Sequence, residues 1–449
     1  MLKRVCLGLL LMLSTYVWSQ VDTNGPEAAS NSGDEVPMRT PPPVSGQAYS
    51  TTFASETPSN ILRAGLTFNT AYSNNVLGAD SPVSDVNYSI WPTLALDAST
   101  TRLHWVLTYS PGFTFYQRVS ALNQSDQNFA LNFQYRLSPH VTASLRDSFQ
   151  KTSNPFNQPN PLSAMSVSGS APTSNVAVIA PAADQITNAA NVQLTYQFRA
   201  DSMIGVGGTF SNLWYPNPAE AAGLFNSTST GGSAFYSRRV LEKYYFGVSY
   251  QYLDVLAYQA GVRGSTQTQT QTQTQTIFLF GTVYLKPSLS LSLSGGPQHY
   301  DATQSPLPAS GSWSPLALAS LGWQGQRTSL AASYSRIVTS TGGLAGAYHS
   351  NIANISGSWQ VRRAWSVGLS ASYSLYKTLT PSFVGSSSGG HTVSGTVSVQ
   401  HPIGEHLSMQ AGYTRVQQSY GGIAAISVVP DTNREFVSIS YQFARPLKR

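Results

Sequence analysis

The sequence predicts an all-β fold, a transmembrane antiparallel up-and-down β-barrel of about 18 strands, with 16 as the alternative count. From residue 60 onward, segments of about 10–14 residues alternate apolar and polar side chains, which is the period of a strand with two unlike faces. The connections between these segments alternate between short and long. Only 10% of the residues are charged, whereas ordinary soluble domains have about 25%.

The expected strands follow one another from residue 60 to residue 443. In residues 127–137, for example, Phe129, Leu131 and Phe133 alternate with small or polar side chains. Strands of this length suit the roughly 9–11 tilted residues that cross a bilayer. The expected strands are residues 60–72, 86–97, 102–116, 127–137, 141–150, 188–198, 202–212, 233–241, 244–254, 270–285, 288–296, 313–323, 327–338, 347–360, 364–377, 390–401, 406–418 and 433–443.

The connection lengths predict how these strands are arranged. Short connections such as residues 138–140 alternate with long ones such as residues 213–232, and outer-membrane barrels have short periplasmic turns and long outer loops. Aromatic residues such as Trp105 and Tyr135 lie near the short turns, as they would in an interfacial girdle. Because unpaired backbone groups are costly in lipid, a spanning sheet must close on itself. The alternative is a secreted β-sandwich or propeller, whose strands are usually about 5–6 residues long.

The N-terminal 59 residues are expected to lie outside the barrel. Residues 1–19 are typical of a signal peptide, with Lys3 and Arg4 before an apolar stretch too short to span a bilayer; a retained anchor is the alternative. Residues 20–59 are rich in Pro and Ser and predict a flexible periplasmic arm. After residue 19 no apolar run of 18 residues occurs, which argues against a helical membrane protein.

The single cysteine, Cys6, lies within the expected signal peptide, so the mature chain is expected to have no disulfide. Attachment of lipid to Cys6 is the alternative, but Lys3, Arg4 and Val5 before it lack the apolar and small residues that such attachment needs.

The last expected strand resembles the assembly signal of bacterial outer-membrane proteins. Val437, Ile439, Tyr441 and Phe443 alternate with polar residues and end in an aromatic pair. The resemblance reaches the superfamily of porin-like barrels. It implies that the barrel-assembly machinery recognises Tyr441 and Phe443. This chain differs from the usual pattern because residues 444–449, a short basic tail, follow the Phe.

No enzymatic activity, cofactor or metal is expected. The sequence lacks GxSxG, HExxH and P-loop motifs. His299 and Asp301 could mimic a protease pair, but solvated loop residues are the simpler interpretation. His391 and His401 share a strand face and are too far apart to act together.

The phase of the alternation predicts which charged side chains face the lumen. Several basic residues fall opposite the apolar positions. Asp97 and Glu435 are expected on the same side. For each arginine, a structural ion pair or a rim position is the alternative to a role in solute selectivity. The candidates are Arg63, Arg102, His104, Arg136 and Arg146.

Two segments fall outside the regular pattern. Residues 151–187 form the longest connection and are apolar, so we expect them to fold into the lumen, with a surface lid or adhesive loop as the alternative. The Thr-Gln repeat at residues 266–276 is expected to extend a strand into water, with a ribbon that binds sugar or a partner as the alternative. Its phase leaves open whether Ile277 and Leu279 or Phe278 and Phe280 face lipid.

These features favour a pore for small polar solutes in the outer membrane of a Gram-negative-type bacterium, because barrels of 16–18 strands are wide enough for an aqueous channel. A polar and weakly charged wall suits neutral or anionic solutes. The alternatives are an export conduit for an exopolysaccharide and a surface scaffold or adhesin without transport. Expected partners are outer-membrane lipid, the barrel-assembly machinery, and a small polar solute or a polysaccharide. Nucleic acid is not expected, because the net charge of +6 is small and the basic residues are scattered.

Changing Phe443 to Asp should leave the exported chain in the periplasm as a protease substrate, because the resemblance makes Phe443 part of the assembly signal. Deleting residues 1–19 should instead trap the chain in the cytoplasm. Cell fractionation with immunoblotting measures both. Wild-type amounts of the Phe443→Asp variant in the outer membrane would contradict the assembly-signal interpretation.

Overall fold

A computed structural model describes residues 60–78, 81–152, 180, 183–241, 243–260, 269–286, 288–304, 307–339, 343–344, 346–379, 389–420 and 431–446. The expected signal peptide, residues 1–19, and most of the expected arm, residues 20–59, lie outside these ranges. Among the described residues, no helix is both long enough and apolar enough to cross a bilayer.

The described residues form strands and one short 3-10 helix, η2 (Ser120–Leu122). The strands are β1 (Ile61–Ser73), β2 (Asp85–Ser99), β3 (Leu103–Tyr116), β4 (Gln124–Arg136), β5 (Val141–Thr152), β6 (Gln185–Arg199), β7 (Ser202–Trp214), β8 (Phe225–Leu241), β9 (Tyr244–Gln259), β10 (Gln269–Lys286), β11 (Leu289–Gln304), β12 (Leu307–Gln324), β13 (Thr328–Thr339), β14 (Tyr348–Arg362), β15 (Trp365–Thr378), β16 (Gly390–Pro402), β17 (Leu407–Tyr420) and β18 (Asp431–Pro446).

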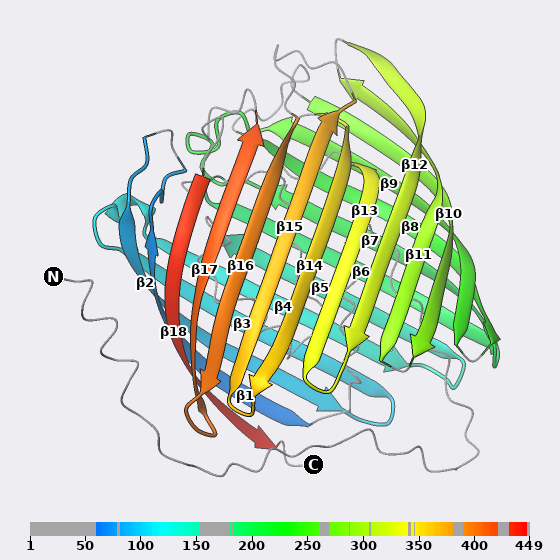
Figure 1. Cartoon of the computed structure of the whole chain (residues 1–449). Coiled ribbons are helices and arrows are strands. Elements are labelled where there is room, and N and C mark those ends of the chain that lie inside the picture. Colours follow the sequence, from blue (N-terminus) through cyan, green and yellow to red (C-terminus); the bar gives the residue numbers. More distant parts are fainter. Residues whose placement is uncertain are drawn as a thin grey trace. The chain divides into compact units, whose positions relative to one another are not determined.

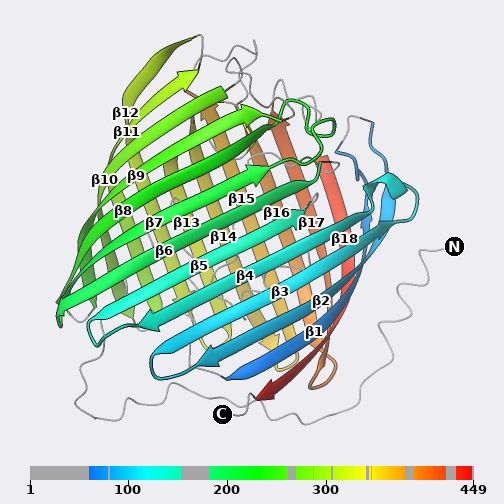
Figure 2. The same cartoon turned by 180° about the vertical axis from the view of Figure 1, so that it is seen from behind.

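The strands close into one antiparallel barrel. Each strand pairs with its neighbours in sequence, and β1 pairs with both β2 and β18. This arrangement confirms the expected closed up-and-down barrel and its count of 18 strands. Figures 1 and 2 show the tilted strands on the two sides of the barrel. We call the two ends the turn end, with the short connections, and the loop end, with the longer ones; in outer-membrane barrels these face the periplasm and the exterior.

The two faces of the wall follow the predicted alternation. In β1, Leu66 and Phe68 are about half exposed, whereas Thr67 and Asn69 between them are buried. Exposed large apolar side chains of this kind recur around the barrel and face outward. In β10, Ile277 and Leu279 are exposed and therefore face outward, while Phe278 and Phe280 face inward, which settles the phase that the sequence left open. The outward apolar face and the polar inward face are those of a membrane-spanning barrel.

Several strands are longer than expected, and all of the large extensions lie at the loop end. β8 begins at Phe225 rather than residue 233, and β11 and β12 continue until only residues 305–306 separate them. The extensions of β8 and β11 bury Phe225, Tyr300 and Ala302 on one face, but their other face lacks a regular set of large apolar residues. The sequence pattern of a membrane-crossing strand is therefore absent there, so the extensions were missed. At the turn end, β18 continues to Pro446, three residues beyond the expected end of the barrel at Phe443, because Ala444 to Pro446 pair with the first residues of β1.

Inward aromatic rings lie against glycines on the neighbouring strand. A Cβ atom added to Gly205 would lie 2.2 Å from the Phe235 ring, and Gly205 and Phe235 are direct cross-strand partners. Because glycine leaves this space empty, the ring lies along the wall instead of projecting across the lumen. The other inward pairs are Trp91 with Gly112, Phe280 with Gly247, Phe436 with Gly412 and Tyr420 with Gly390.

Changing Gly205 to Ala should therefore lower the free energy of unfolding by about 1–3 kcal/mol, because the new methyl group forces the Phe235 ring out of its position. Gly208→Ala in the same strand is the matched control, since its Cβ would have no atom closer than 3.9 Å. Denaturant titration in detergent micelles measures both. Equal midpoints for the two variants would show that the ring does not depend on the glycine.

Candidate functional site

The lumen wall from β13 to β17 is lined mainly by hydroxyl and amide side chains, with Ile337, Ile352 and Val416 among them. In β15, Ser366, Ser370, Ser372 and Ser374 share the inward face, opposite the exposed Leu369 and Tyr373. The neighbouring strands continue this surface, and its hydroxyls bond to each other in the pairs Thr396–Thr414 at 3.0 Å and Ser329–Ser358 at 2.7 Å. Away from the strand ends, no charged side chain points inward from these five described strands. We call this surface the hydroxyl wall.

The predicted lumen residues lie on the other half of the barrel, in β1 to β5. Arg63, His104, Arg136 and Arg146 share faces with inward residues of their strands, and Arg146 is exposed within the barrel. Arg136 is the last residue of β4, and its Nη2 donates to the Pro139 carbonyl at 3.4 Å. These four are thus spread over several strands and do not form one cluster.

Arg102 and Glu435 are placed differently from the prediction. Arg102 lies in the turn before β3, where it is exposed, so it is a rim residue and not part of the wall. Its carbonyl accepts a hydrogen bond from the Arg136 amide, which ties two neighbouring turns together. Glu435 is exposed and alternates with inward Arg434, so it faces outward. Glu435 shares this outward face with Val437 and Ile439, so its expected position in the lumen was wrong.

His104 and Asp97 form an ion pair on the inner wall. His104 Nε2 lies 3.3 Å from Asp97 Oδ1, and both side chains are about one-quarter exposed. Asp97 therefore faces the lumen as expected, and its charge balances His104 when the imidazole is protonated. A balanced pair favours a structural role over solute selectivity.

Arg434 is a buried inward cation that the sequence analysis missed. Its side chain is 7% exposed, and the guanidinium carbon lies 6.0 Å from the centre of the Phe436 ring. Its Nε has no hydrogen-bond partner among the described residues. No motif marks this residue, and the signal that could have found it is its position opposite the apolar alternation of Val437 and Ile439.

The loop end is spanned by an apolar cluster that joins opposite sides of the barrel. Tyr215 and Leu224, which flank the connection from β7 to β8, pack with Leu344, which precedes β14. β7 and β8 lie across the ring of strands from β16 and β17, so this contact passes over the lumen. The cluster also contains the inward tyrosines at the strand ends and several smaller residues, which are Tyr348, Tyr376, Tyr420, Ala180, Ala183, Leu213, Ala221 and Ala260. We call this group the mouth cluster.

Tyr215 is the central contact of the mouth cluster. It is 2% exposed, and a Cβ on Gly343 would lie 2.6 Å from its hydroxyl oxygen. Gly343 has a φ of 86°, a left-handed conformation that other residues rarely adopt, and its carbonyl accepts a hydrogen bond from Phe225. The Tyr215 hydroxyl has no partner among the described residues. Burial raises the pKa of Tyr215 well above its ordinary value, so the phenol is neutral and the contact persists until the pH exceeds the ordinary tyrosine pKa.

Most of the longest connection, residues 151–187, lies outside the described residues. Its expected position in the lumen therefore stays a prediction. The Thr-Gln repeat is described from Gln269 onward. It forms the start of β10, with buried inward threonines and glutamines that point outward. Gln271 Nε2 donates to both carboxylate oxygens of Asp254 at 3.0 and 3.1 Å, so the repeat is part of the extended barrel wall.

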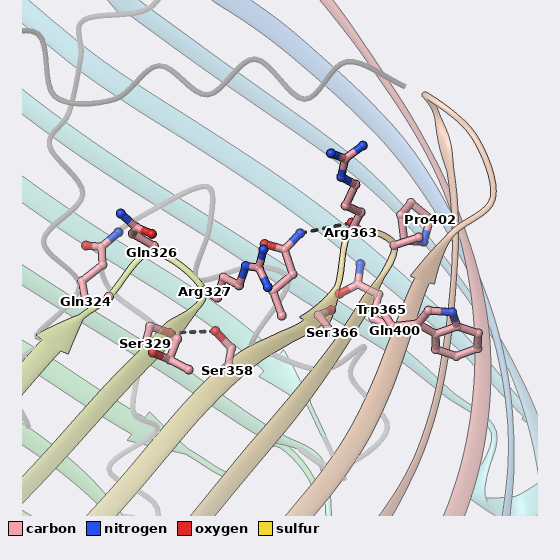
Figure 3. A pocket seen from close by; sticks show the side chains of 14 residues that line it. Gln324, Gln326, Arg327, Ser329, Ser358, Arg363, Trp365, Ser366, Gln400 and Pro402 are labelled. Atoms are coloured by element: carbon pink, nitrogen blue, oxygen red, sulfur yellow. Dashed lines mark hydrogen bonds between the residues drawn. The ribbon is translucent and has the colours of Figure 1, made fainter. Parts of the chain in front are cut away.

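A polar hollow lies at the turn end of the hydroxyl wall. Figure 3 shows side chains around it from the turns after β12 and β14 and from the adjoining strand ends, including Gln400 and Pro402 of β16. Ser329 and Ser358 share their hydrogen bond on its wall, and Gln360 Nε2 donates to the Arg363 carbonyl at 3.1 Å. Arg327 and Arg363 are the only charged side chains among the residues that line it. The hydroxyl wall therefore ends in a hollow that carries positive charge and no carboxylate.

No catalytic or metal site is evident in the described residues. His299 Nδ1 lies 3.4 Å from Asp301 Oδ2 on the outward face of β11, and the His299 ring lies 4.9 Å from Trp313, which is exposed. Among the described residues, no three His, Cys, Asp or Glu side chains are grouped so that they could hold a metal ion.

Tyr441 and Phe443, which the sequence predicts to form an assembly signal, lie at the seam where the barrel closes. Tyr441 and Phe443 are on the outward face of β18, 52% and 40% exposed, and they pair with Leu66 and Ala64 of β1.

No protein-family model matches the chain, and no curated protein is significantly similar to it. Several solved structures are similar in fold. The ferric citrate transporter FecA, in its unliganded form, is 11% identical with a TM-score of 0.40, and the match covers 80% of this chain and 60% of FecA. OccAB4 of Acinetobacter baumannii is 8% identical with a TM-score of 0.39, covering 87% of this chain and 100% of that one. OccK2 (OpdF) of Pseudomonas aeruginosa is 10% identical with a TM-score of 0.42, covering 86% and 98%.

The chain folds as an outer-membrane β-barrel. The strand pairing and the outward apolar face carry this conclusion. At the low identities and TM-scores above, the similar structures add no argument about what this barrel carries.

The mouth cluster generates a test of whether the loop end restricts the lumen. Changing Tyr215 to Ala removes the central contact, at a cost of about 3–5 kcal/mol of packing free energy, and should raise single-channel conductance several-fold. Tyr215→Phe is the matched control and should leave conductance unchanged, because the hydroxyl it removes is buried without a partner. Planar-bilayer recording measures both. Unchanged conductance in Tyr215→Ala, with the barrel still resistant to heat on gels, would show that the cluster does not restrict the path.

Proposed function

We propose that this protein is a channel for small polar solutes that carry little or no charge. The observation that supports the proposal is the hydroxyl wall. Its serine, threonine, asparagine and glutamine side chains donate and accept hydrogen bonds without a fixed charge. Such a surface replaces the hydration of an uncharged, hydroxyl-rich solute better than that of an ion, which loses more solvation free energy.

The two ends of the barrel support a path through the hydroxyl wall. The mouth cluster narrows the loop end, where its members are almost fully buried. Toward the turn end the inward serines Ser366, Ser370 and Ser372 are partly exposed, and the wall leads to the polar hollow in Figure 3. A solute that passes the mouth cluster would meet hydroxyl groups for the rest of the wall.

Liposome swelling tests the proposal directly. Vesicles that contain the purified barrel should admit a neutral monosaccharide, and they should admit a sugar acid of the same size more slowly. Vesicles without protein are the control. No flux of either sugar would contradict transport and favour the surface scaffold or adhesin. Faster entry of the sugar acid would contradict the preference for uncharged solutes.

A pair of adjacent substitutions in β15 tests the assignment of the wall. Ser372→Lys should fold normally and shift the reversal potential toward anion selectivity, because Ser372 faces the lumen between Asn354 and Ser394. Ala371→Lys, one residue away, should lower stability by about 2–4 kcal/mol, because it places the charge in lipid near the middle of the strand. Bilayer recording and denaturant titration measure these effects. The opposite pattern would reverse the inward and outward faces.

A further inference from the structure

Three basic side chains gather on the outward face of β13 to β15 at the loop end. His349 and Lys377 are direct cross-strand partners, which places their Cβ atoms about 4.5–5.5 Å apart. Arg336 pairs with Asn351, two residues along β14 from His349. The same face carries the exposed Tyr334, whose hydroxyl donates to Asn351 at 3.2 Å. We call Arg336, His349 and Lys377 the outer basic cluster.

No acidic side chain balances this cluster. The sequence contains no Asp or Glu between Asp301 and Glu405. The charges that act on His349 come from Arg336 and Lys377, and both repel its protonated form. Neither Arg336 nor Lys377 has an ion-pair partner among the described residues. Like charges on neighbouring strands are destabilising, so a bound anion would reduce the electrostatic repulsion between these side chains.

The β11–β12 hairpin packs beside the outer basic cluster. The ladder between β12 and β13 stops at the pair Ala317–Arg336, and the hairpin continues beyond the neighbouring strand ends (Figure 1). Beyond the last pair of this ladder, Ser314 Oγ of the hairpin lies 3.4 Å from His349 Nδ1. The Gln298 amide holds the end of β13 by bonding to both the N–H and the carbonyl of Val338, at 2.8 and 3.3 Å.

Among the described residues, Arg336 has one donor without a partner. Its Nε is buried and has no hydrogen-bond partner in the described part of the chain. A buried guanidinium N–H without an acceptor is costly, and an anionic oxygen is the acceptor that such a group binds most strongly. The cluster thus combines uncompensated positive charge with a vacant hydrogen-bond donor.

We propose that the outer basic cluster binds the phosphate groups of an anionic lipid in the outer leaflet. The cluster faces lipid and not the lumen, because it shares its face with Tyr334 and Tyr373. Its height fits a headgroup: Lys377 follows Trp365 at the turn end by 12 residues, which is about 40 Å along the strand. A strand tilt of about 35–45° reduces this to roughly 30 Å, just beyond the apolar band of about 25 Å.

Binding of diphosphorylated lipid A to the full-length barrel in detergent tests this site, with native mass spectrometry as the readout. The double variant Arg336→Gln, Lys377→Gln should bind lipid A at least about tenfold more weakly. The matched control is Arg415→Gln. Arg415 is also an outward arginine near the loop end, but Asp431 Oδ2 accepts a hydrogen bond from its Nη2 at 2.9 Å. The control should bind like the wild type.

Two further arms identify the ligand group. Dephosphorylated lipid A should bind the wild type no better than it binds the double variant. Inorganic phosphate in millimolar excess should compete only weakly if the lipid itself is the ligand, and strong competition would assign the site to free phosphate. Heat-resistant mobility on gels shows that each variant is folded. Equal binding of lipid A by the folded double variant and the wild type, or an equal loss in Arg415→Gln, would overturn the proposal.

Discussion

The fold depends on one constraint, which is that backbone N–H and C=O groups facing lipid must be paired within the protein. Pairing of β1 with β18 meets this requirement by removing the free edges of the sheet. Once the ladder is closed, each strand has one face in lipid and one face toward the lumen, and the alternation of the sequence follows. The same pairing therefore determines the wall, the lumen and the rims. Only alternate residues of each strand have side chains that can contact a solute in the lumen.

This constraint explains how much of the structure could be predicted. All of the membrane-crossing strands were found, because lipid demands apolar residues at alternate positions such as Leu66 and Phe68. The polar ends of β8, β11 and β12 were missed, because strands outside lipid need no such pattern. Arg102 was misplaced because β3 begins at Leu103, one residue later than expected, which leaves Arg102 in the turn. Glu435 was misplaced although the apolar alternation of Val437 and Ile439 puts it on the outward face.

The mouth cluster could not have been predicted. Tyr215 and Leu344 are far apart in the sequence and meet only because the ring brings their connections over the same opening. No local pattern encodes such a contact. The hydroxyl wall is a different case, because the alternating serines of β15 are plain in the sequence. A polar and weakly charged wall was therefore expected from the sequence, although the candidate residues singled out in it were the charged ones.

The short ladder between β12 and β13 makes the ring mechanically unequal. It runs only from Ala317–Arg336 to Gln324–Ser329, whereas the ladder between β11 and β12 extends from Leu289–Trp323 to Gln304–Leu307. Fewer backbone hydrogen bonds join β12 to β13. Separating these two strands therefore costs less free energy than separating a pair of strands with a longer ladder. The barrel wall is thus weakest at one place, the loop end of the joint between β12 and β13. Transient sideways separation would begin there, and amides along the upper part of β12 would exchange with water before those in the rest of the wall.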